Sequence, residues 1–197
     1  MMIKVLAIGD VGNIITTISK FSKSKIHVIN FIQDGMGKYT YADDVKTFSS
    51  YKVSEQVKQI NQIKDEFDIC ITMGTGERIA YLADLNYVPF YVGRDIDAPR
   101  FKKNSKEEWF DEPLHKLNFF ERRFYKNAFE NAVSHVAYGW AFEHLKKFTE
   151  NGIKMDMEPI DPDLFNEYAI PLEREKTKFT FFSPQRMGKP KGTDLLW

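Results

Sequence analysis

The chain has 197 residues and carries 28 basic and 28 acidic side chains, so its formal net charge at pH 7 is zero. A chain without an excess of positive charge is not expected to be a general nucleic-acid-binding protein. The length is enough for one complete domain with a sizeable core and part of a second, and no apolar run approaches the length of a membrane span.

The first predicted element is a buried strand at 3–8, where the run IKVLAI is continuously apolar. A glycine turn follows at 9–13, and a helix is predicted at 14–21. The turn does not spell a complete GxGxxG motif, so two interpretations stay open. It is either a tight turn that needs glycine, or a loop in which Gly12 and Asn13 approach a phosphate.

The same alternation of strands and helices continues along the chain. Further strands are predicted at 26–31, 68–73, 88–93 and 133–138. Further helices are predicted at 52–66, 77–85, 114–132 and 140–150. Strands that alternate with helices predict an α/β fold, here a Rossmann-like parallel sheet with helices on both faces.

The single cysteine, Cys70, lies in the apolar run of the strand at 68–73. A chain with one cysteine has no internal disulfide framework, which predicts a reducing, cytoplasmic environment. Cys70 itself is interpreted as a small core residue rather than a catalytic thiol.

Ionisable residues follow the predicted strand at 88–93, namely Arg94, Asp95 and Asp97. Because the carboxyl ends of parallel strands form the binding edge of such sheets, these residues are candidate ligand contacts. Arg94 would hold a phosphate or carboxylate and Asp95 would orient a hydroxyl. A structural Arg94–Asp95 ion pair is the alternative. Tyr138, at the end of the next strand, is a further candidate.

Basic and aromatic side chains are interspersed along the predicted helix within 114–132. A helix of this composition can lie on an anionic membrane surface. The alternative is a helix that packs one face on the sheet and exposes a charged outer face.

The end of the chain predicts a strand, a loop and the start of a helix. Phe179–Phe182 is aromatic and strand-like, and 193–197 begins an apolar helix with Thr193 as N-cap. In α/β proteins such a unit often surrounds a phosphate, and Arg186 and Lys191 would be its cations.

This stretch resembles the start of the second domain in glycosyltransferases of family 4, which have the GT-B fold. The family reads roughly G-R-x-x-x-x-K-G there, and Arg186, Lys191 and Gly192 keep the spacing, although Gln185 replaces the first glycine. The segment MEPIDPDLF at 157–165 is similar to the inter-domain segment of the family but lacks its Asn-Gly pair.

The resemblance implies an acceptor-side domain at 1–156, an inter-domain linker at 157–178 and the incomplete start of a donor-binding domain at 179–197. It implies transfer of a sugar, with retention, from a nucleotide-sugar donor to a saccharide or lipid-linked acceptor, without a metal or cofactor. The protein would be cytoplasmic, with a possible peripheral membrane contact through Leu114–Ala132.

The resemblance also implies roles for particular residues. Arg186 and Lys191 would be catalytic, because they would stabilise the charge of the departing diphosphate. Gly192, Gly12 and Asn13 would join them around the donor phosphates, and Arg94, Asp95, Asp97 and Tyr138 would contact the acceptor. The paired glutamates of the family, E-x7-E, do not occur after Lys191, so the chain by itself is expected to have little or no transferase activity.

Three alternatives remain open. The chain could be a non-catalytic module that binds an acceptor or a partner. It could be another α/β nucleotide-binding protein, of the response-regulator or dehydrogenase type, although Asp34 is then the sole candidate for the expected ribose-binding acid. It could be a metal-dependent GT-A transferase that uses Asp95-Ile96-Asp97 as its Asp-x-Asp motif.

Overall fold

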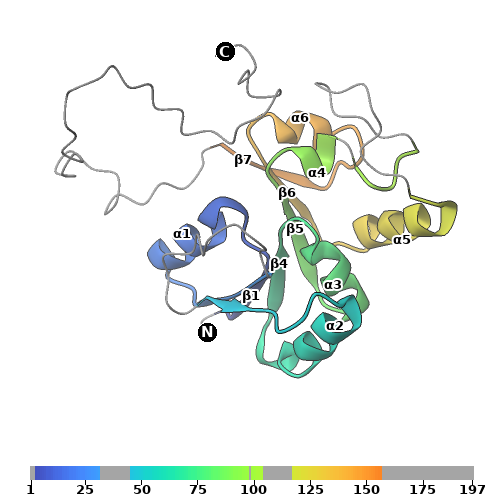
Figure 1. Ribbon diagram of the computed structural model, residues 1–197. Helices are drawn as coiled ribbons and strands as arrows, with labels where there is room; N and C mark the ends of the chain where they lie inside the picture. The colour runs from blue at the N-terminus through green and yellow to red at the C-terminus, as the bar shows by residue number, and fades with distance from the viewer. Residues whose placement is uncertain (1–2, 32–44, 98, 104–116, 157–197) are drawn as a thin grey trace, which may run out of the picture. The chain divides into compact units, whose positions relative to one another are not determined.

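The computed structural model describes residues 3–31, 45–97, 99–103 and 117–156. Within these residues the protein forms one seven-stranded parallel sheet (Figure 1). The strands are β1 (Val5–Ile8), β2 (Ile26–Asn30), β3 (Lys46–Thr47), β4 (Ile69–Thr72), β5 (Tyr87–Tyr91), β6 (His135–Tyr138) and β7 (Gly152–Met155). They lie side by side in the order β3-β2-β1-β4-β5-β6-β7, and every neighbouring pair is parallel.

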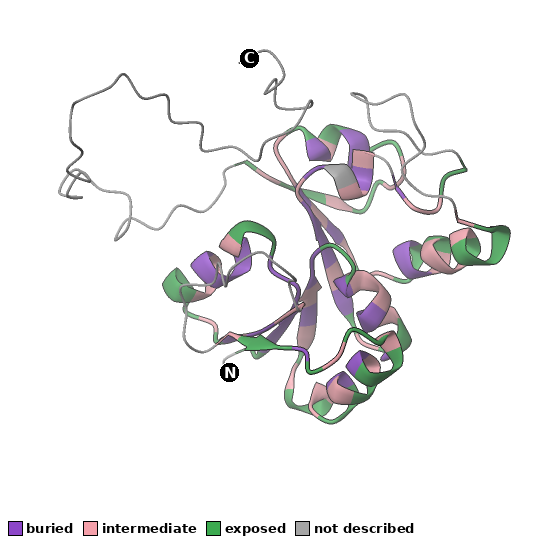
Figure 2. Cartoon of the chain, in the orientation of Figure 1, coloured by how far each residue is buried: buried purple, intermediate pink, exposed green. Residues whose placement is uncertain are grey.

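The central strands are buried on both faces, as their apolar runs predict. In β1, Leu6 and Ile8 point into the core on one face of the sheet, while Val5 and Ala7 point into the core on the other. All four β1 residues are buried, and Figure 2 shows purple, buried segments along the strands in the middle of the sheet. This two-residue alternation divides the interior into two layers.

Helices cover both faces of this sheet (Figure 1). The helices are α1 (Ile14–Phe21), α2 (Val53–Asn61), α3 (Gly76–Leu82), α4 (Arg94–Asp97), α5 (Phe119–Glu130) and α6 (Ala141–Leu145). Helix α1 packs Ile14 and Ile15 against Ala7 and Val28 on one face. Helices α2, α3, α5 and α6 contribute apolar side chains to the opposite face, where Tyr91 and Ala137 of the sheet lie.

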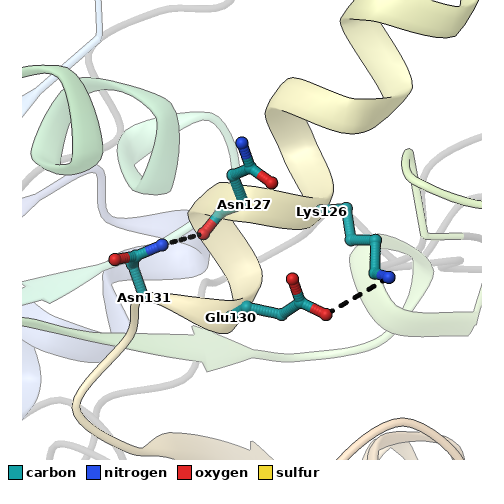
Figure 3. Close-up of polar contacts among 4 residues, drawn as sticks. All are labelled: Lys126, Asn127, Glu130 and Asn131. Atoms are coloured by element: carbon teal, nitrogen blue, oxygen red, sulfur yellow. Dashed lines mark hydrogen bonds and ion pairs between the residues drawn. The ribbon is translucent and has the colours of Figure 1, made fainter.

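Helix α5 has defined ends. At its start, Asn118 accepts a hydrogen bond from the Glu121 amide at 2.9 Å, and Glu121 accepts one from the Asn118 amide at 2.8 Å, which is a complete capping box. At its end, the Asn131 side chain donates to the carbonyl of Asn127 at 2.8 Å (Figure 3). Phe129, in the last turn of α5, is buried in the core, and Phe124 in the middle of the helix contacts the ring of Tyr81. The helix therefore packs through its middle and its last turn, while Phe119 and Phe120 at its start stay exposed.

The predicted fold class is confirmed: the structure is an α/β, Rossmann-like parallel sheet with helices on both faces. All five predicted strands are present within one or two residues of their predicted bounds. The short strand β3, the strand β7 and the short helix α4 were not predicted. The predicted domain boundaries stay a prediction, because 157–178 and 179–197 lie outside the described residues.

Among the described residues, no helix is both long enough and apolar enough to cross a membrane.

Candidate ligand site at the carboxyl edge of the sheet

The strand order changes direction between β1 and β4. From β1 the chain moves outward to β2 and β3, then returns to the other side of β1 and continues through β4 to β7. The crossovers on the two sides of this point run in opposite directions, and in open α/β sheets ligands are expected beside such a point, at the carboxyl ends of the strands. The turn at Gly9–Asn13, here the β1 turn, and the turn at Gly74–Gly76, here the β4 turn, border this point.

The two turns are in direct backbone contact at their bases. A Cβ atom on Gly9 would lie 2.6 Å from the carbonyl oxygen of Met73, and one on Gly76 would lie 2.2 Å from the carbonyl oxygen of Ile8. Both distances are shorter than side chains tolerate, so glycine is required for this close approach. Further out, Gly12 and Gly74 are exposed. A ligand therefore has access to the backbone of both turns.

The start of helix α1 is already occupied by a carboxylate of the chain itself. Asp10 is buried and accepts hydrogen bonds from the amides of Ile15 at 2.8 Å and Thr16 at 3.0 Å, as well as from the Thr16 hydroxyl. A phosphate at this edge would therefore meet a negative charge at the α1 terminus rather than free amides. Gly12 and Asn13 precede the helix, and both have left-handed backbone angles.

A small pocket opens beside the β4 turn, on the face of the sheet covered by α3 and α5. It has a volume of about 40 Å³, which suits one small group rather than a whole metabolite. We call it the acid pocket, because two of its polar lining residues are Glu77 and Asp95. Its other lining residues are Gly74, Thr75, Arg78, Tyr91, Ile96, Pro99, Arg100, Phe101, Tyr125 and Phe129.

Glu77 belongs to a row of three polar side chains from three elements. The Tyr91 hydroxyl lies 3.4 Å from Glu77 Oε2 and also 3.4 Å from His135 Nδ1. The rings of His135 and Tyr91 are stacked, and His135 also stacks on Phe129 with 4.2 Å between ring centroids. The row therefore runs from helix α3 through the end of β5 to the start of β6, with aromatic packing around it.

Burial changes the protonation of this row. Desolvation raises the pKa of Glu77 to about 7, although its hydrogen bond to Tyr91 acts in the opposite direction. Desolvation also lowers the pKa of His135 to about 4 and raises the pKa of Tyr91 well above its usual value. At neutral pH, His135 and Tyr91 are therefore uncharged, and Glu77 is divided between its two forms.

Asp95 is the second acid of the pocket. Burial raises its pKa to about 6, and hydrogen bonds from backbone amides, including Gly93 N–H at 3.2 Å, limit the rise. The Coulombic repulsion of Asp95 adds to the raised pKa of Glu77, whereas the charge of Arg100 lowers it. The two acids and Arg100 therefore act on one another electrostatically.

Two arginines contribute to the same pocket. Arg100 donates to the Tyr125 hydroxyl at 3.4 Å and lies over its ring. Arg78 lies over the ring of Phe124, and its Nε is buried without a hydrogen-bond partner among the described residues. A buried donor without a partner is uncommon and costs free energy unless a ligand or water satisfies it.

The predicted acceptor residues separate in the structure. Asp95 lines the acid pocket, but Asp97 lies on the same short helix with its carboxylate 3.2 Å from His144 Nδ1 of α6. Arg94 begins α4. Tyr138 packs with the core cluster on the opposite face, together with Phe90 and Val136. Of Asp95, Asp97 and Tyr138, the structure thus brings Asp95 to the pocket, while the side chain of Arg94 lies outside the described part of the chain, so its predicted role and the Arg94–Asp95 ion pair stay predictions.

The Asp-x-Asp metal alternative is not supported by this arrangement. The Asp95 carboxylate accepts a hydrogen bond from the Gly93 amide, whereas the Asp97 carboxylate pairs with His144. The two carboxylates therefore have different partners. Among the described residues, there is no group of three or more potential metal ligands. Cys70 is buried, and burial raises its pKa, which agrees with its interpretation as a core residue.

The predicted phosphate-binding residues near the end of the chain and the acid Glu77 differ in outcome. Arg186, Lys191 and Gly192 lie outside the described residues, so their phosphate-binding role stays untested. Glu77 was not predicted as a site residue. Its position directly after the Gly-Thr-Gly turn, at the start of a helix, was a signal in the sequence, but its contact with Tyr91 and Asp95 required the fold.

The comparisons with known proteins identify no family. No family model matches the chain, and no curated protein matches it. Similar solved structures include two crystal structures of short-chain dehydrogenases/reductases from Veillonella parvula DSM 2008, one of the wide type in complex with NADP and one ethylated. Their TM-scores are 0.40 and 0.38, each at 8% identity over 71% of this chain and 70% of the neighbour. A likeness this weak assigns no function to the chain.

The glycosyltransferase prediction was wrong. The structural neighbours are dehydrogenases/reductases, and no family model matches the chain to the glycosyltransferases. The nucleotide-sugar donor, the saccharide or lipid-linked acceptor and the transferase activity are corrected with it. The peripheral membrane contact through Leu114–Ala132 stays a prediction. The physical reason is that a strand, a basic glycine loop and a helix start recur in many α/β folds, so two short motifs do not select one family.

Proposed function

We propose that the described domain binds a small phosphate-bearing ligand of the nucleotide type at the carboxyl edge of its sheet, beside the β4 turn. The observation that carries the proposal is the change in strand order between β1 and β4, which makes this edge the expected ligand crevice of an open α/β sheet. The exposed glycine backbone of the β4 turn lies at that point.

The two arginines near the β4 turn favour a phosphate group at one particular place. Because Asp10 occupies the start of α1, the phosphate is expected on the side of α3 and α5, where Arg78 and Arg100 line the acid pocket. The pocket would take one phosphate, and the rest of the ligand would lie along the exposed turns Gly9–Asn13 and Gly74–Gly76.

A binding assay with matched ligands tests this proposal. The protein is titrated with mono- and dinucleotides, and with the corresponding nucleosides as phosphate-free controls, by isothermal titration calorimetry. We expect at least one nucleotide to bind, and its nucleoside to bind at least tenfold more weakly. Equal binding of the two, or binding of neither, would refute the proposal.

Substitutions at glycine turns locate the site. Gly74→Asp places a negative charge at the β4 turn, and aspartate and asparagine both tolerate left-handed backbone angles. A charge about 4 Å from a phosphate costs roughly 1–4 kcal/mol, so affinity should fall about tenfold or more. Gly74→Asn is the neutral control. Gly139→Asp is the positional control, because Gly139 follows β6, two strands away, and also has open space around it.

A further inference from the structure

The acid pocket is lined by two basic and two acidic side chains, and its net charge depends on whether one acid carries a proton. Arg78 and Arg100 contribute guanidinium groups to it, while Glu77 and Asp95 contribute carboxyl groups. With both acids ionised, the four side chains are neutral in sum. When Glu77 carries a proton, the pocket has a net positive charge and a carboxylic O–H that can donate a hydrogen bond.

We propose that the acid pocket is a phosphate subsite that binds its anion together with one proton on Glu77. The proposal rests on the proposed function for the identity of the ligand, and on the pocket itself for the coupling. The phosphate would take hydrogen bonds from the arginines and from protonated Glu77, and the ionised form of Glu77 would repel it.

Two arginines line the pocket and could bind an anion there. Arg78 and Arg100 both belong to its lining, and the buried Nε of Arg78 has no hydrogen-bond partner among the described residues. Arginine N–H groups form strong, charge-assisted hydrogen bonds with phosphate oxygens. The two guanidinium groups are therefore the donors expected to hold a phosphate in this pocket.

The surroundings of Glu77 place the pKa of its carboxyl group at about 7, so it can bind or release a proton near neutral pH. The charged and titratable groups that face it come from each neighbouring element: Arg78 on α3, Tyr91 on β5, His135 on β6 behind Tyr91, Asp95 on α4, Arg100 after α4 and Tyr125 on α5. His135 and Tyr91 do not change charge near neutral pH, because their pKa values are displaced far from it. Asp95 titrates at about 6, so Glu77 is the acid that titrates between neutral and mildly alkaline pH.

The pH dependence of binding is the direct test. With ADP as the probe, affinity is measured by calorimetry at about pH 6.5 and about pH 8.5. If only the protonated form of Glu77 binds, affinity should fall roughly twentyfold across this interval. Repeating the titration in two buffers of different ionisation enthalpy should show uptake of a proton on binding.

The variant Glu77→Gln isolates the contribution of the residue. Glutamine stays neutral at both pH values, so the fall in affinity should be lost, and the probe's own titration is the same for both proteins. Glu55→Gln is the matched control, because Glu55 is also an acid in the first turn of a helix, α2, but it is exposed. An unchanged pH dependence in Glu77→Gln would overturn the proposal.

Inorganic phosphate separates this proposal from the proposed function. The melting temperature is measured with and without phosphate at both pH values, for the native protein and Glu77→Gln, with acetate as the control anion. Stabilisation by phosphate that weakens at high pH only in the native protein supports the subsite even if no nucleotide binds. Nucleotide binding without pH dependence or proton uptake would leave the proposed function intact and refute the coupling.

Discussion

At the carboxyl edge of the sheet, burial changes the acid–base properties of single residues, above all Glu77. Glu77 lies at the start of a helix, where an acid is normally favourable and charged. Here the surrounding aromatic side chains exclude water, and desolvation prevails over the hydrogen bond from Tyr91. The same residue type on α2, Glu55, is exposed. Burial, not the position in the helix, therefore distinguishes the two acids.

Replacement of Glu77 should change how stability depends on pH. Because the pKa in the folded state is raised to about 7 from 4.5, the native protein holds more protons than the unfolded chain between these values. Its free energy of unfolding therefore decreases as pH rises through this window. Glu77→Gln should remove that loss and stabilise the protein at about pH 8 by on the order of 1–3 kcal/mol. Chemical denaturation at about pH 4.5 and about pH 8 measures the free energy of unfolding of both proteins. An equal change caused by Glu77→Gln at the two pH values would contradict the explanation.

His135 should make the free energy of unfolding rise with pH, in the opposite direction to Glu77. Its pKa is lowered to about 4 from 6.5, so the unfolded chain binds more protons between these values, and stability rises with pH across this window. His135→Gln should therefore flatten the loss of stability between about pH 6.5 and about pH 4. Thermal melts at several pH values test this, with His27→Gln as a control for a half-buried histidine outside the row. A loss of stability that stays as steep in His135→Gln would argue against a neutral, buried imidazole.

Gly76 should tolerate no side chain. A Cβ at this position would lie 2.2 Å from the Ile8 carbonyl oxygen, which is backbone and can move only if β1 moves. Gly76→Ala should cost about 1–3 kcal/mol of stability, as expected for overpacking against a rigid neighbour. The control is Gly152→Ala, where the added atom meets only the Leu145 and Phe142 side chains at 3.1 and 3.3 Å. Urea denaturation should give Gly76→Ala a clearly lower free energy of unfolding than Gly152→Ala.

At the scale of the elements, helix α5 depends on its first turn. Phe119 and Phe120 in its first turn are exposed, Phe120 by 79%, so packing does little to hold that end. The capping box between Asn118 and Glu121 satisfies backbone groups that would otherwise lack partners. From the sequence, this helix was predicted to begin at 114, and Asn118 was not predicted as its cap.

Removal of this cap should destabilise the protein by about 1 kcal/mol. Asn118→Ala deletes the acceptor for the Glu121 amide, and N-cap replacements of this kind usually have that effect. Asn131→Ala at the other end removes one exposed hydrogen bond to Asn127 (Figure 3) and should cost only a few tenths of a kcal/mol. Amide hydrogen exchange provides the local readout: faster exchange of the first α5 turn is expected in Asn118→Ala alone.

Strand β7 illustrates why some elements were not predictable. Its sequence, Gly-Ile-Lys-Met, has no apolar run, and Ile153 and Lys154 are exposed. It is a strand because β6 pairs with it along its whole length, from His135 opposite Gly152 to Tyr138 opposite Met155. Pairing with a neighbour, rather than local preference, created this edge strand.

For the whole molecule, zero net charge predicts low solubility near neutral pH. The acidic and basic side chains are equal in number, and the isoelectric point of the sequence is about 6.9. With little net repulsion between molecules, association is favoured at that pH. The concentration at which the protein precipitates should be lowest at about pH 7 and should rise toward about pH 9. A solubility that decreases steadily with rising pH would contradict this expectation.

The sequence by itself determined five of the seven strands and the longer helices that cover them. Continuous apolar runs such as 3–8 and the helical spacing of Val53, Val57 and Ile60 are local signals, because burial on one or both faces dictates them residue by residue. The glycine turns after β1 and β4 were predictable for the same reason, since a close approach of two backbones permits no side chain.

Only the tertiary structure decided the site. Glu77, Tyr91 and His135 are far apart in the chain, and nothing local to any of them indicates their hydrogen-bonded row. Asp95 and Asp97 are two residues apart but face different partners, which their spacing did not show. The raised pKa of Glu77 comes from water excluded by α5 and the sheet together, and such burial exists only after the chain has folded.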